Sequence, residues 1–84
     1  MDPIPILKGY LVEELAAAPA DLENLDTRLV EDDIIDSLGI FSLVDFIEER
    51  FQVTVEPTDI TIENFGTLRA MGNLVTEKLN APRA

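Results

Sequence analysis

The chain contains no His, no Cys and no Trp. The absence of His removes the usual general base, and the absence of Cys removes the thiol nucleophile. Together the two absences also remove the nitrogen and sulfur ligands that zinc prefers. We therefore expect neither His- nor Cys-based catalysis and no zinc site. Because a chain without Cys forms no disulfide framework and is compatible with a reducing compartment, we expect a cytoplasmic protein.

Long apolar runs and basic residues are also scarce. No apolar run reaches membrane-spanning length, and residues 1–10 lack the basic region and apolar core that a signal peptide needs. Only 6 Lys and Arg stand against 17 Asp and Glu, so the formal net charge is −11. A charge of this sign repels phosphate backbones and attracts basic protein surfaces. We therefore expect no membrane and no nucleic acid as partners.

The negative charge is concentrated in the middle of the chain. Thirteen acidic side chains and two basic ones lie between Asp21 and Glu63, so this segment carries the whole net charge of −11. Asp32, Asp33 and Asp36 lack the glycine and the distal Glu of a calcium loop, so no metal site is predicted here. The pattern is typical of a solvated surface or of a face that meets a basic partner.

The length of 84 residues, 46% of them apolar, suffices for one modest core. We expect a single domain over residues 1–84, with 80–84 as a flexible tail. Apolar residues at three- and four-residue spacing predict four helices, over about residues 4–17, 37–51, 61–65 and 68–79. Residues 20–35 show no such period and predict a long loop that apolar side chains pin to the core. The predicted fold class is an all-α four-helix bundle with a long first loop and a short third helix.

Two of these helices have a clear apolar face. The predicted inward face of the second helix comprises Ile40, Leu43, Val44, Ile47 and Phe51. That of the last helix, for which Thr67 is the predicted N-cap, comprises Leu68, Met71, Leu74, Val75 and Leu79. Between the two helices, residues 52–56 predict a short extended piece that ends at Pro57.

Asp36 and Ser37 stand where the acidic loop becomes the second helix. Both are good N-cap residues, so the start of a helix is by itself a sufficient reason for an Asp and a Ser at these positions. A serine hydroxyl is a poor nucleophile without a positioned base, and the chain has no His and no Lys between Lys8 and Lys78. We therefore expect Ser37 to catalyse nothing. It is well placed to be modified, because a phosphate on its Oγ would lie at the positive end of the helix.

These residues resemble a known family. The triplet Asp36-Ser37-Leu38, after an acidic loop and before the stretch Leu43-Val44-Asp45-Phe46-Ile47-Glu48-Glu49-Arg50-Phe51, is similar to the acyl carrier proteins. The resemblance covers nearly the whole chain, since the order and lengths of the helices fit the four-helix bundle of that family. It implies that a phosphopantetheinyl transferase, using coenzyme A and Mg²⁺, attaches 4′-phosphopantetheine to Ser37. The thiol of the arm then holds acyl groups as thioesters, so the chain would be a carrier and a substrate of enzymes, not an enzyme.

The resemblance also implies a docking surface on the second helix. Its expected residues are Asp36, Leu38, Phe41, Asp45, Glu48 and Glu49. For Leu38 and Phe41, burial in the core is an equal alternative. The implied partners are the transferase, an acyl-loading ligase or acyltransferase, and synthase, condensing or tailoring enzymes with basic docking surfaces. We expect the carrier itself to be a monomer.

The nature of the cargo stays open. Fatty-acid carriers usually have a small residue two places before the Asp and further acids directly after Ser-Leu, where this chain has Ile34, Gly39 and Ser42. The stretch from Ile34 to Gly39 is more similar to freestanding carriers of specialised pathways, including polyketide-type biosynthesis. Asp36, in place of the usual His, argues against the peptidyl carriers of modular synthetases, whereas an aminoacyl cargo of the D-alanyl type remains an alternative.

Two further hypotheses complete the prediction. The core could open to receive an acyl chain among Leu43, Val44, Ile47, Phe65, Leu68, Met71 and Val75, because flexible Leu and Met lie on facing helices. In the alternative from another functional class, the chain is an unmodified acidic helical module that only binds proteins.

Overall fold

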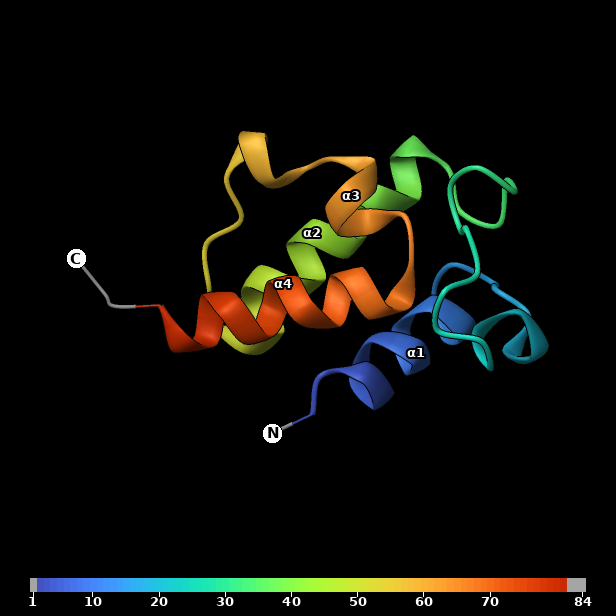
Figure 1. The fold of residues 1–84 in the computed structure, drawn as a ribbon, viewed down its shortest axis with the longest axis horizontal. Coiled ribbons are helices and arrows are strands. Elements are labelled where there is room, and N and C mark those ends of the chain that lie inside the picture. Colours follow the sequence, from blue (N-terminus) through green and yellow to red (C-terminus); the bar gives the residue numbers. More distant parts are fainter. Residues whose placement is uncertain (1, 82–84) are drawn as a thin grey trace.

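The structure is a computed structural model that describes residues 2–81. Its elements in chain order are α1 (Ile4–Glu13), η1 (Pro19–Leu22), α2 (Ser37–Phe51), η2 (Pro57–Asp59), α3 (Ile62–Phe65) and α4 (Leu68–Asn80). Figure 1 shows α1 lying beside α4 and α3 packing near the beginning of α4. Because the described chain forms helices and no strand, the predicted all-α bundle is confirmed.

The core lies where the four α-helices face one another. Its fully buried side chains include Leu7, Leu11, Leu43, Ile47, Phe65, Leu68, Met71 and Val75. Burying one such side chain contributes about 1.5–3 kcal/mol. The predicted inward face of α2 is buried throughout, as is that of α4 with one exception. Leu79, near the end of α4, is 39% exposed, so its predicted inward position is wrong.

The first helix is shorter than predicted. α1 ends at Glu13, and Ala16 has the left-handed backbone conformation with φ of 58°. The Ala17 N–H donates to the carbonyl of Leu11, six residues earlier, at 3.0 Å. This hydrogen bond spans more residues than the bonds within an α-helix, and it closes the end of α1. Pro19 then opens η1, which was not predicted. The prediction overran because alanine favours helix whatever its tertiary surroundings.

The long loop between α1 and α2 rests on the corner between α3 and α4. Its Leu22 and Leu29 side chains are buried, which confirms the predicted anchoring. The Leu29 N–H donates to the Gly66 carbonyl at 2.7 Å, and the Arg69 N–H donates to the carbonyl of Leu25 at 3.0 Å. The loop is thereby held by hydrogen bonds to residues about forty positions further along the chain.

Between α2 and α4 the structure confirms the predicted short helix α3 and the predicted start of α4, and it adds the short helix η2. Thr61 caps α3 by accepting the Asn64 N–H at 3.2 Å, and Thr67 caps α4 by accepting the Ala70 N–H at 3.1 Å. Residues 52–56 pair with no strand within the described chain, and η2, which was not predicted, follows them.

The C-terminal end of α4 extends slightly further than predicted, to Asn80. Of the expected tail over 80–84, residues 82–84 lie outside the described residues. Among residues 2–81, no helix is long and apolar enough to cross a membrane.

Candidate functional site

Asp36 determines where α2 begins. Its backbone is extended, and its Oδ1 accepts the N–H of Gly39 at 2.8 Å, while its carbonyl accepts the N–H of Ile40 at 3.0 Å. Asp36 is therefore the N-cap and Ser37 the first helical residue. Of the two residues that the sequence offered as caps, the structure selects Asp36.

The side chain of Ser37 is available to another molecule. Ser37 is exposed, and its hydroxyl makes no hydrogen bond within residues 2–81. No acidic residue lies in the first turn of α2, so the positive end of the helix dipole faces the surroundings of Ser37. An anionic group on Ser37 Oγ would thus be stabilised by the helix, and the described chain places no base on this hydroxyl.

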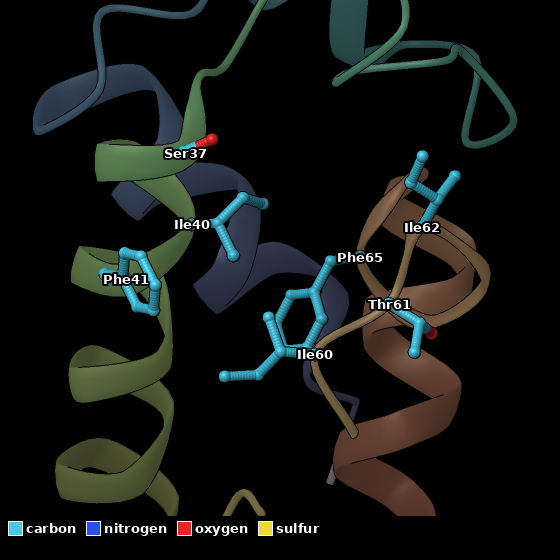
Figure 2. A pocket seen from close by; sticks show the side chains of 7 residues that line it. All are labelled: Ser37, Ile40, Phe41, Ile60, Thr61, Ile62 and Phe65. Carbon is cyan, nitrogen blue, oxygen red and sulfur yellow. The ribbon is translucent and has the colours of Figure 1, made fainter. Parts of the chain in front are cut away.

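A hollow of about 210 Å³ lies beside Ser37, between α2 and the segment that leads into α3. Its lining comprises Ser37, Ile40, Phe41, Ile60, Thr61, Ile62 and Phe65. Figure 2 shows Ile40 and Phe65 pointing toward each other across the space, with Ser37 at one end. Apart from the hydroxyls of Ser37 and Thr61 the lining side chains are apolar, and none is charged.

This hollow differs from the cavity that the sequence suggested. Of the seven core residues expected to open for an acyl chain, only Phe65 lines it. The others are buried in the core, whereas Phe41 and Ile62 at the hollow are 58% and 57% exposed. The space is therefore close to the surface and present without any opening of the core.

Three residues of the hollow were missed by sequence reasoning: Ile60, Thr61 and Ile62. Thr61 was recognised only as a helix start, and nothing local in the sequence indicates that this segment faces Ser37. Asp59 anchors the segment, because its carboxylate accepts the N–H of Glu56 at 2.8 Å and pairs with Lys78 of α4 at 2.6 Å. Lys78 and the Glu56 N–H hold the pKa of Asp59 below its ordinary value.

The expected docking residues of α2 lie on its outer face and are exposed, except Glu48, which is partly buried. Leu38 is 76% exposed and Phe41 is 58% exposed, so neither is a core residue. Asp45 and Glu49 are also exposed. At helical spacing Leu38, Asp45 and Glu49 share one stripe, while Ser37, Phe41 and Glu48 share the next.

Glu48 has a structural bond in addition. It is partly buried, and its Oε2 accepts the N–H of buried Val55 at 2.9 Å. Its carboxylate therefore helps to hold the loop after α2, and less of its charge faces outward than that of Asp45 or Glu49.

No group of three or more acidic side chains within residues 2–81 is arranged to hold a metal ion. The site is thus an exposed serine at a helix start, with an apolar hollow on one side and acidic residues along the helix. It can accept a covalent group and present it to a partner.

Comparisons with known proteins show the family to which the chain belongs. A family model described as "Phosphopantetheine attachment site" matches residues 5–75. A D-alanyl carrier protein of Abiotrophia defectiva is 32% identical over 71 residues, covering 84% of this chain and 90% of the relative. A Serratia protein named "Probable acyl carrier protein PigG" is 36% identical over 74 residues, covering 83% and 85%. A D-alanyl carrier protein of Bacillus mycoides is 32% identical over 73 residues, covering 87% of each chain. The chain therefore belongs to the family of carrier proteins with a phosphopantetheine attachment site, and it is a carrier and not an enzyme.

Proposed function

We propose that the chain is a stand-alone acyl carrier protein whose Ser37 Oγ bears the 4′-phosphopantetheine arm. The observation that carries this proposal is the position of Ser37. It is exposed, it is the first residue of α2, and it lies at the hollow between α2 and α3. When bound, the arm supplies the thiol that a chain without Cys lacks, and this thiol holds the cargo as a thioester.

The residues around Ser37 orient the attachment. Asp36 holds the first turn of α2 through Gly39, which keeps Ser37 at the helix end. The dipole of this 15-residue helix favours the negative charge of a phosphodiester there. Leu38 and Phe41 leave apolar surface beside the attachment point, where a visiting enzyme gains contact area.

We propose an uncharged acyl group as the cargo. The hollow beside Ser37 has no charged lining residue, so an ammonium group there would lose its hydration without gaining a counter-ion. The D-alanyl carrier proteins among the relatives support the alternative of an aminoacyl cargo. The character of the hollow favours the acyl group, destined for fatty-acid, polyketide or related specialised biosynthesis.

The partners follow from this role. Family membership implies a phosphopantetheinyl transferase and an enzyme that loads the arm. We propose that these enzymes, and the synthase or tailoring enzymes that receive the cargo, present basic surfaces to Leu38, Asp45 and Glu49. Such encounters are accelerated by opposite charge and weaken with salt. Because the arm comes from coenzyme A, we place the protein in the cytoplasm.

Intact mass tests the attachment. Wild type, Ser37→Ala and Ser42→Ala are each incubated with coenzyme A, Mg²⁺ and a broad-specificity transferase. Ser42 is the matched control because it is another exposed serine of α2. We expect wild type and Ser42→Ala to gain one arm and Ser37→Ala to gain none. If no variant gains mass while a known carrier in the same tube is modified, the chain is an unmodified interaction module.

The cargo is tested on the modified protein. The transferase is supplied with hexanoyl-coenzyme A or alanyl-coenzyme A, from which it attaches the already loaded arm to Ser37 and releases adenosine 3′,5′-bisphosphate. The methyl NMR signals of Ile40, Ile60 and Ile62 are then compared. We expect the hexanoyl group to shift these signals and the alanyl group to leave them near their positions in the unloaded protein. Equal shifts for both groups would contradict the preference for an uncharged acyl cargo.

A further inference from the structure

A second groove lies between α1 and α2, on the side of α2 away from Ser37. Its volume is about 380 Å³, larger than the hollow beside Ser37. The lining comprises Pro5, Ile6, Gly9, Tyr10, Glu13, Glu14 and Phe46. Phe46 follows Ser37 by nine residues, roughly two and a half helical turns, so the two side chains leave α2 in opposite directions. A partner in this groove would leave Ser37 accessible.

The base of the groove is a pair of aromatic rings. Tyr10 and Phe46 are stacked with ring centroids 4.2 Å apart and an interplanar angle of 19°. Both residues are only partly buried, so part of their ring surface remains open. An exposed aromatic face attracts the head group of Arg or Lys and packs against the aliphatic stem of either side chain.

Gly9 keeps the groove open, although the fold does not require glycine there. A Cβ added at Gly9 would meet no atom within 4 Å, and its φ is not positive. Glycine inside a helix is less favourable than alanine, so this position weakens α1 without relieving any clash. Departures from local preference that have no structural compensation are typical of functional positions.

The rim of the groove shows a second such departure. Glu13 is the last residue of α1 and Glu14 is its C-cap, and no basic residue lies in the last turn. Both are exposed, and within residues 2–81 neither pairs with a cation. Because the C-terminal end of a helix carries partial negative charge, two carboxylates there are unfavourable until a cation reaches them.

We propose that this groove is a docking site for a basic, amphipathic segment of a partner protein. An Arg or Lys of the segment lays its stem over Tyr10 and Phe46, and its head group meets Glu13 and Glu14. The assignment extends the carrier function and does not depend on it, since Ser37 takes no part. Through this groove one partner can hold the carrier while the arm on Ser37 serves another enzyme.

Tyrosine fluorescence tests the proposal directly, because Tyr10 is the only tyrosine and the chain has no Trp. The probe is a synthetic amphipathic peptide with Leu and Arg on one helical face, and a matched peptide has Gln in place of Arg. We expect saturable binding of the Arg peptide and binding of the Gln peptide that is about tenfold weaker. Absence of a saturable Tyr10 signal with the Arg peptide would overturn the proposal.

Two double variants distinguish peptide binding in the groove from nonspecific attraction of the basic peptide to an acidic protein. Glu13→Gln/Glu14→Gln and Glu63→Gln/Glu77→Gln change the net charge equally, but only the first alters the groove, since Glu63 and Glu77 are exposed residues of α3 and α4. We expect about tenfold weaker peptide binding for the first and near wild-type binding for the second. Equal losses in both would show that only the net charge attracts the peptide.

A substitution at Gly9 tests the shape of the groove. Gly9→Leu fills open space on α1, so the melting temperature should rise while peptide binding weakens. A purely structural role for Gly9 predicts unchanged binding, which would count against the proposal. The peptide should also leave the rate of arm transfer to Ser37 unchanged, since the two sites lie on opposite sides of α2. A transfer rate that falls as the peptide binds would place the peptide on the Ser37 side instead.

Discussion

The carboxylate of Asp36 stabilises the start of α2 and also fixes the position of Ser37. One oxygen accepts the Gly39 N–H at 2.8 Å, and this bond sets Ser37 as the first residue of α2. In the triplet Asp36-Ser37-Leu38 the first residue therefore caps the helix, the second has an exposed side chain, and the third exposes apolar surface. Each of these properties follows from where the side chain stands relative to the helix end.

Removing this cap should destabilise the protein measurably. We expect Asp36→Ala to lower the free energy of unfolding by about 1 kcal/mol. For a chain of this size that loss corresponds to a melting temperature lower by about 4–8 °C, measured by circular dichroism. Asp36→Asn keeps an oxygen in place and should melt close to wild type. Asp45→Ala, on the same helix but without such a bond, is the control, and an equal effect of both alanine variants would contradict the capping role.

The segment between α2 and α4 shows how short elements form one wall of the site. η2 and α3 are too short to be stable alone, and they are held by bonds to longer helices. Glu48 of α2 binds the Val55 N–H, and Lys78 of α4 binds Asp59. The wall residues Ile60 and Thr61 follow directly after this anchor, so the hollow beside Ser37 depends on both contacts.

The anchor at Asp59 should make part of the stability depend on pH. The pKa of Asp59 is lowered in the folded protein by Lys78 and by the Glu56 N–H. A lowered pKa stabilises the fold above the ordinary value of 3.8, and this contribution is lost as the pH falls below it. We expect Asp59→Asn to be less stable than wild type by about 1 kcal/mol at pH 7, and the difference to shrink below about pH 4.

Thermal melts of both proteins over a pH series measure this difference. Glu77→Gln, an exposed change on α4, serves as the control and should follow wild type. A gap between Asp59→Asn and wild type that stays constant from pH 7 to about pH 3 would contradict the ion-pair explanation.

The molecule as a whole carries far more negative charge than its ion pairs neutralise. Its net charge is −11, and among residues 2–81 three ion pairs form, by Arg28, Arg69 and Lys78. The pairs of Arg28 and Arg69 are exposed, and exposed ion pairs stabilise a fold only weakly. From this excess of acids we expect the repulsion among the acids of residues 21–63 to outweigh the attraction within these pairs.

This imbalance predicts that salt stabilises the protein. Added NaCl or Mg²⁺ should raise the melting temperature, because screening relieves more repulsion than the attraction it removes. The variant Asp45→Asn/Glu49→Gln should melt higher than wild type at low salt and respond less to added salt. A wild-type melting temperature that is flat across an ionic-strength series would show that the repulsion is already relieved in the fold.

The parts of the fold that could be predicted are those decided by neighbours in the chain. α2, α3 and α4 begin where Asp36, Thr61 and Thr67 accept amide hydrogens three residues ahead, and such caps can be recognised from a few consecutive residues. The inward face of α2 follows from helical spacing alone. The proposed role of Ser37 rests in the same way on a local triplet in a helical context, and it stays a prediction.

Tertiary packing decided the remainder. The left-handed turn at Ala16 ends α1 early, against the helix preference of alanine, as the chain turns toward η1. Only the packed structure brings Ile60 and Ile62 to Ser37 and stacks Tyr10 on Phe46, because these contacts join residues more than twenty positions apart. The position of Ser37 at the start of α2 thus follows from local sequence, whereas the hollow and the groove on either side of α2 exist only once distant segments pack together.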